Sequence, residues 1–170
     1  MGNEKFLNLV KSHASRLQEA QSSQAVDWEK RKLWWITQVD TLLGDVRQWL
    51  KALEDQQILT IETKKISINE EDIGSYDVNS MVIKLGFQTL TFKPVASVVV
   101  GGFGRVDIEG PGGSVMLLLL SLSSDVTAPD RMNNVAWHIF SHRDRRTSRE
   151  FDEASFQSIF SSLLLIGGEE

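Results

Sequence analysis

The residues of this sequence with the most evident capacity for chemistry are four arginines near the C-terminal end. They lie within one short polar segment, as Arg143, Arg145, Arg146 and Arg149. Guanidinium groups bind phosphates and carboxylates through paired hydrogen bonds, so four on one loop could hold an anionic headgroup, a phosphate or an acidic partner. The competing interpretation is that nearby carboxylates neutralise them, the candidates being Asp144, Glu150, Asp152 and Glu153.

A second group of residues resembles a metal-dependent site. Glu62-Thr63-Lys64 lies in a segment with strand periodicity, and Asp45 and Asp55 precede it. This arrangement resembles the Asp…Glu-x-Lys motif of the restriction-endonuclease-like nucleases, in which carboxylates hold magnesium and the lysine steadies the attacking water. The resemblance implies a nuclease site at Glu62 and Lys64. That family usually places its first aspartate at the tip of a strand hairpin, whereas Asp55 is expected to end a helix, so the alternative is paired surface charges on an edge strand.

The composition argues against several other kinds of site. The chain has 170 residues, no cysteine and a formal net charge of −5. Without cysteine there are no disulfides, thiolate nucleophiles or thiolate metal ligands, and the negative charge argues against a general nucleic-acid binder. No glycine-rich phosphate loop follows a strand, so no cofactor is expected. His138 and His142 are four residues apart on a predicted strand, about 13 Å, which is too far to share a metal ion, so no metal is expected either. The longest apolar run, Val115–Leu120, is far shorter than the ~20 residues of a membrane-spanning helix.

An apolar stripe with three tryptophans dominates the region from Val26 to Gln57. Its members recur every seven residues or midway between: Trp28, Trp35, Val39, Leu42, Val46, Trp49 and Leu53. A seven-residue spacing returns to nearly the same side of an α-helix, so these residues form one continuous face. The chain's own sheet, another helix or another subunit must cover that face. We therefore predict a protein interface that includes Trp28, Trp35 and Trp49.

The first 57 residues are expected to form a helical hairpin. Asn3 can cap a first helix that runs to about Ala20, and the polar stretch Gln21–Gln24 predicts a break. A second helix then runs to about Asp55, and the first helix would fold back against it. The apolar face of the first helix consists of Phe6, Leu9, Val10, His13 and Leu17.

Residues 58–170 are expected to form an antiparallel β domain closed by a helix. Alternating apolar and polar residues mark short strands from Ile58 onward, and turns such as Gly110-Pro111-Gly112-Gly113 separate them. Since no helix is predicted between strands, the sheet should be an antiparallel meander of six or seven strands, curved or closed into a partly open barrel. Asp152 is expected to cap a final helix with an apolar face of Phe156, Ile159, Phe160, Leu163 and Leu164. The predicted fold class is α+β.

These patterns favour a non-catalytic protein-interaction or scaffolding module that acts through its long Trp-bearing helix, as a homodimer or with another protein. The first alternative is a barrel that binds an anionic headgroup or phosphate through the Arg143–Arg149 loop. The second alternative is a metal-dependent nuclease. We expect a cytoplasmic protein with no membrane-spanning segment, and we predict neither an enzyme nor a nucleic-acid binder.

Overall fold

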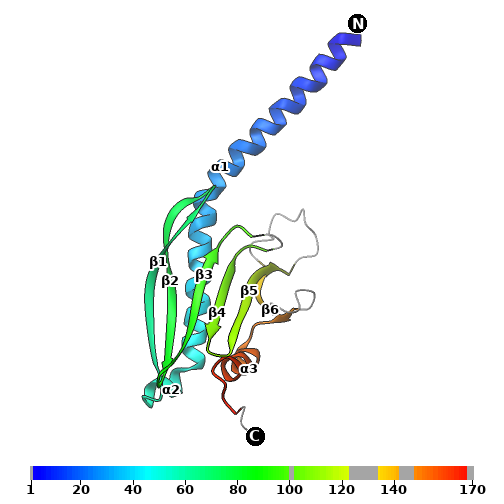
Figure 1. The fold of residues 1–170 in the computed structure, drawn as a ribbon. Coiled ribbons are helices and arrows are strands. Elements are labelled where there is room, and N and C mark those ends of the chain that lie inside the picture. The colour runs from blue at the N-terminus through cyan, green and yellow to red at the C-terminus, as the bar shows by residue number, and fades with distance from the viewer. Residues whose placement is uncertain (1, 100–101, 123–133, 142–147, 168–170) are drawn as a thin grey trace. The chain divides into compact units, whose positions relative to one another are not determined.

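The computed structural model describes residues 2–99, 102–122, 134–141 and 148–167, and only the backbone of residues 2 and 19–27. The chain runs from a long helix into an antiparallel sheet and then into a shorter helix, which confirms the α+β class (Figure 1). The helices are α1 (Gly2–Trp49), α2 (Lys51–Asp55) and α3 (Glu153–Leu163). The strands are β1 (Thr60–Glu70), β2 (Gly74–Leu85), β3 (Gln88–Ala96), β4 (Arg105–Gly110), β5 (Gly113–Ser121), β6 (Val135–Ser141) and β7 (Arg149–Glu150).

Helix α1 is continuous from Gly2 to Trp49, so the helical hairpin expected at the N-terminus is wrong. The stretch Gln21–Gln24 is helical, because glutamine and serine are tolerated inside helices and neither glycine nor proline interrupts them. The chain divides into two compact units, Met1–Trp34 and Trp35–Glu170, whereas the sequence placed a boundary after Gln57. The helix therefore contributes residues to both units.

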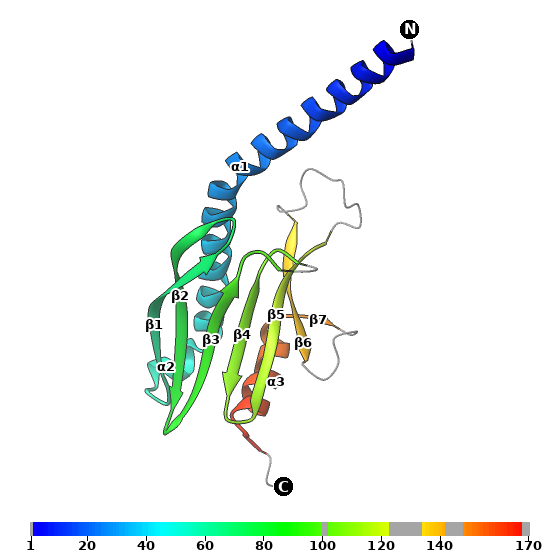
Figure 2. The same cartoon turned by 45° about the horizontal axis from the view of Figure 1, so that its top comes forward.

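All seven strands form one sheet, and each strand pairs antiparallel with its neighbour in sequence (Figure 2). This is the meander expected from the short turns between strands. No pairing joins β1 to β7 among the described residues, so the sheet is open at both edges. β1 pairs with β2 from Thr60↔Lys84 to Glu70↔Gly74, but β2 pairs with β3 only over Met81–Leu85.

Strand β3 continues through Pro94, a residue that lacks a backbone N–H. Its pairing with β2 stops at Phe92, so the missing N–H of Pro94 removes no hydrogen bond to that strand. Pro94 still lies opposite Val106 of β4, and the register shifts between Pro94 and Ala96. A bulge at this place accommodates the proline without ending the strand.

The core of the second unit lies between one face of the sheet and two helical segments. Trp35 is fully buried, and its ring centroid lies 6.0 Å from that of Trp137 on β6. Trp49 lies 5.6 Å from the ring of Phe156 on α3, which in turn lies 6.2 Å from Phe92 on β3. The C-terminal part of α1 and helix α3 therefore pack on each other and on the same face of the sheet.

Helix α3 begins and packs as the sequence predicts. The side chain of Asp152 accepts a hydrogen bond from the backbone of Ser155, whose hydroxyl accepts one from the backbone of Asp152, which together form a capping box. All five residues of the predicted apolar face are buried. At the other end of the helix, the backbone N–H of Gly112 donates to the carbonyl of Leu163 at 2.7 Å. The turn between β4 and β5 thus fixes the end of α3.

Candidate functional site

Three of the four clustered arginines, Arg143, Arg145 and Arg146, lie outside the described residues. The fourth, Arg149, begins the short edge strand β7 and pairs with Ile139 of β6. The pairing with β6 therefore fixes the backbone of Arg149 at the edge of the sheet. Ser141 and Ser148 are the described residues on either side of the arginine-rich segment.

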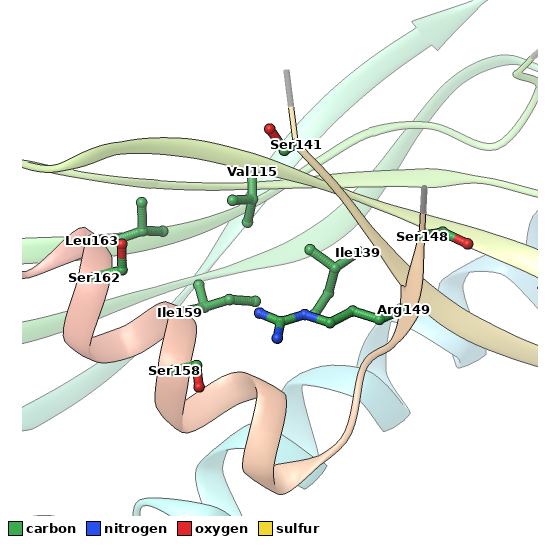
Figure 3. A pocket seen from close by; sticks show the side chains of 9 residues that line it. All are labelled: Val115, Ile139, Ser141, Ser148, Arg149, Ser158, Ile159, Ser162 and Leu163. Carbon is green, nitrogen blue, oxygen red and sulfur yellow. The ribbon is translucent and has the colours of Figure 1, made fainter. Parts of the chain in front are cut away.

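Arg149 lines a cavity of about 320 Å³ between the β5–β7 edge of the sheet and helix α3 (Figure 3). The apolar part of its wall consists of Val115, Ile139, Ile159 and Leu163. Its polar groups are Ser141, Ser148, Ser158, Ser162 and Arg149. We call this the Arg149 cavity.

Strand and helix periodicity bring these side chains together. Val115 and Ser141 are cross-strand partners on β5 and β6, and Ile139, two residues before Ser141, shares their face of the sheet. On α3, Ser158 and Ser162 are four residues apart and so lie one turn apart on one side of the helix. Sequence reasoning missed all four serines of the wall, including Ser158 and Ser162. The sequence signal that could have identified Ser158 and Ser162 is their four-residue spacing, which places them on one side of α3 beside its apolar face.

Among the described residues that line the cavity, Arg149 alone is charged. Of the ion pairs between described residues, none involves Arg149, so neither Glu150 nor Glu153 neutralises it directly. The pKa of Asp152 lies below its ordinary value chiefly because the backbone N–H of Ser155 donates to it, with a smaller contribution from the charge of Arg149. Of the carboxylates expected to neutralise the arginines, Asp152 therefore interacts electrostatically with Arg149 without forming an ion pair, and Asp144 lies outside the described residues.

The nuclease-like residues lie on the exposed edge strand β1. Glu62 interacts with two lysines: Nζ of Lys84 lies 3.4 Å and Nζ of Lys64 lies 4.0 Å from its carboxylate. Asp55 pairs with Lys51 on α2 at 3.2 Å. Across the part of the chain that the structure describes, no three His, Asp or Glu side chains come together in a way that could hold a metal ion. Cross-strand ion pairing is therefore the arrangement observed at Glu62.

The three tryptophans predicted to form an interface differ in exposure. Trp35 is 0% exposed inside the second unit and Trp49 is half-buried against Phe151 and Phe156, while Trp28 is half-buried in the first unit. A fully buried indole offers no surface to another protein. The second unit therefore covers the Trp35 part of the stripe with its own residues.

The apolar face near the N-terminus of α1 is exposed instead. Its side chains keep between half and three quarters of their surface exposed: Phe6 65%, Leu9 71%, Val10 51% and Leu17 54%. Sequence reasoning identified this face but assigned it to packing within a hairpin. Because the helix does not turn at Gln21–Gln24, no second helix of a hairpin covers the face.

None of the described helices combines the length and apolar character needed to cross a membrane. No protein-family model matches this chain, and comparisons with curated proteins and with solved structures also give no match.

Proposed function

We propose that this protein is a non-catalytic interaction module that self-associates through the exposed apolar face near the N-terminus of α1. This face consists of Phe6, Leu9, Val10, His13 and Leu17, and we call it the N-terminal face. The observation that carries the proposal is its exposure, which reaches 71% at Leu9. Contiguous exposed apolar surface of this kind is typical of interaction sites.

The division of α1 between the two units supports an interaction role. Four residues of the apolar stripe are buried in the core of the second unit, which anchors the helix there: Trp35, Val39, Leu42 and Val46. Before Trp34 the helix belongs to a unit that contains no strand among its described residues. A helix that is anchored in the second unit and carries an exposed apolar face in the first unit is suited to connect the folded second unit to a partner.

A second copy of the same chain is the partner that the spacing favours. Phe6, Val10, His13 and Leu17 are separated by four, three and four residues, which is the a/d spacing of a two-stranded coiled coil. Two copies present the same stripe to each other, so the contact can close as a symmetric dimer. The charged residues of the segment fall outside this stripe, so pairing would bury none of them: Glu4, Lys5, Lys11, Arg16 and Glu19. Because the stripe covers only about three turns, the association is expected to be weak.

Sedimentation velocity of the full chain over a range of concentrations tests the proposal. We expect a dimer at high micromolar concentration, and we expect the double variant Val10→Glu, Leu17→Glu to remain monomeric because it buries charge in the contact. The matched control is Asn8→Glu, Ser15→Glu, which adds the same charges about half a turn away on the opposite side of the helix. A wild-type chain that is monomeric at high micromolar concentration contradicts self-association, as does a control variant that dissociates equally.

A further inference from the structure

We propose that the Arg149 cavity binds a small organic anion, in which a carboxylate or phosphate group is joined to a compact apolar body. This binding site is separate from the N-terminal face and does not depend on self-association. It rests on the described residues of the cavity wall, where one arginine and four serines border four aliphatic side chains.

The apolar part of the wall is a fixed surface. Ile139, Ile159 and Leu163 are 7%, 4% and 4% exposed, so they belong to the packed core and have little freedom to close the cavity. An apolar group placed against them would leave water without displacing any protein contact. This surface selects ligands that carry a hydrocarbon part.

The described polar part of the wall offers hydrogen-bond donors and one positive charge. Figure 3 shows the guanidinium of Arg149 extended from β7 toward Ile159 on α3. Arg149 is exposed, so its guanidinium is accessible to a ligand, and a guanidinium binds oxyanions through charge-assisted hydrogen bonds. The hydroxyls of Ser158 and Ser162 lie one helical turn apart and can donate to the same anion. No carboxylate is found among the described residues of the wall.

The size of the cavity restricts the ligand. About 320 Å³ lies at the lower end of the range of ~300–1,000 Å³ for small-molecule sites. A single ring or a short branched chain with one anionic group fits this volume, whereas a nucleic acid or an extended peptide does not. The ligand class is therefore a small monoanion or phosphate monoester with an apolar body.

Titration of the full chain with simple probes tests the assignment. The probes are benzoate and phenyl phosphate, with inorganic phosphate lacking the apolar part and phenol lacking the charge. Nuclear magnetic resonance of methyl groups follows binding, and Val115, Ile139 and Ile159 report on the cavity. We expect the two organic anions to shift these methyl signals, with inorganic phosphate and phenol binding at least about tenfold more weakly, since each loses one of the two contributions.

Substitution of Arg149 tests whether the anion binds at this cavity or at another arginine of the chain. Arg149→Gln should weaken binding by about tenfold to a hundredfold, because a charge-assisted hydrogen bond is lost. The matched control Arg16→Gln, an exposed arginine in the first unit, should leave binding unchanged. Ser158→Ala with Ser162→Ala should weaken binding to a smaller degree, and the dispersion of the spectrum shows whether each variant is folded.

The assignment would be overturned if Arg149→Gln bound the organic anions as tightly as the wild type, or if inorganic phosphate or phenol bound as tightly as the organic anions. It would also be overturned if the methyl shifts were confined to residues outside the cavity, or if neither organic anion bound at millimolar concentration. Loss of binding in Arg145→Gln, Arg146→Gln but not in Arg149→Gln would place the anion on the arginine-rich segment instead. Binding to vesicles containing phosphatidate without binding of phenyl phosphate would replace a free small anion with a lipid surface.

Discussion

Trp35 of α1 lies directly against Gly104, the residue immediately before β4, with no room for a side chain between them. A Cβ atom built on Gly104 would overlap Cζ3 and Cε3 of the indole ring, and the φ angle of Gly104 is +153°. The carbonyl of Gly104 also accepts a hydrogen bond from the backbone N–H of Leu119 at 3.0 Å. Glycine at this position therefore allows the tryptophan of a helix to contact the backbone of the sheet.

The substitution Gly104→Ala should destabilise the second unit strongly. The added methyl group must displace a fully buried tryptophan and occupy a strained backbone conformation, so we expect the free energy of unfolding to fall by about 3 kcal/mol. Urea denaturation followed by tryptophan fluorescence measures this. The control is Gly44→Ala in α1, where a Cβ meets no atom within 4 Å and helix propensity predicts a gain of up to about 1 kcal/mol. Equal effects at the two glycines would refute the close contact.

The carboxylate of Glu70 connects the end of β1 to the segment after β3. It accepts hydrogen bonds from the backbone N–H of Ser97 at 3.0 Å, from that of Val98 at 3.0 Å, and from the hydroxyls of Ser97 and Tyr76. Burial alone would raise the pKa of Glu70, but these hydrogen bonds together lower the pKa below its ordinary value of 4.5. The ionised form is therefore the one that stabilises the fold.

This lowered pKa predicts how stability changes with pH. Because the pKa of Glu70 is lower in the folded state, its contribution is complete above the unfolded pKa of about 4.5 and is lost as pH falls through the folded pKa. Denaturation at a series of pH values should show Glu70→Gln less stable than wild type at neutral pH, with a smaller loss of stability on acidification. The control Glu71→Gln, at an exposed neighbouring position, should retain the wild-type profile. A wild-type profile in Glu70→Gln would contradict the role of the carboxylate.

Tyr76 provides an independent measurement of the same interaction, since it is the only tyrosine in the chain. Burial, the hydrogen bond to Glu70 and the negative charge of Glu70 all raise the pKa of Tyr76 above its ordinary value of 10.0. Alkaline titration followed by near-ultraviolet absorbance should show no tyrosinate in the native protein at about pH 10, where tyrosine in the denatured chain is half ionised. The pKa of Tyr76 should move downward in Glu70→Gln. If Tyr76 of the native protein ionised near pH 10, the interaction between Tyr76 and Glu70 would be absent.

Phe156 of α3 should be central to the packing of helix against sheet. It is 1% exposed and contacts the rings of Trp49, Phe92, Phe151 and Phe160. The substitution Phe156→Ala should lower the free energy of unfolding by about 3–5 kcal/mol, because it leaves a large cavity. Phe87→Ala is the matched control, since Phe87 is 99% exposed in the turn between β2 and β3 and its loss should cost under about 0.5 kcal/mol. A small effect at Phe156 would argue against the observed packing of α3.

The sequence was sufficient to predict most helices and strands of the second unit, because local patterns and tertiary packing agree there. The spacing of Phe156, Ile159 and Leu163 and the cap at Asp152 define α3, and the same residues are buried in the structure. The turn at Gly110–Gly113 likewise separates two strands as predicted.

The first unit was less predictable from local patterns. A run of polar residues such as Gln21–Gln24 is compatible with a loop or with an exposed helix, and only packing decides between them. The Arg149 cavity depends on the distance between α3 and β7, which spacing along the chain does not contain. The arginine cluster was visible in the sequence, but the hydroxyls of Ser158 and Ser162 gain significance only when α3 lies against the sheet.

We propose that the N-terminal face of α1 is exposed in a single chain and covered when a second chain binds. Hydrogen–deuterium exchange of the backbone at low and high protein concentration tests it most directly. We expect peptides covering residues 3–18 to exchange more slowly at high concentration in the wild type but not in Val10→Glu, Leu17→Glu, while peptides from β4 and β5 exchange equally at both concentrations. Exchange of residues 3–18 that does not depend on concentration in the wild type would contradict the claim.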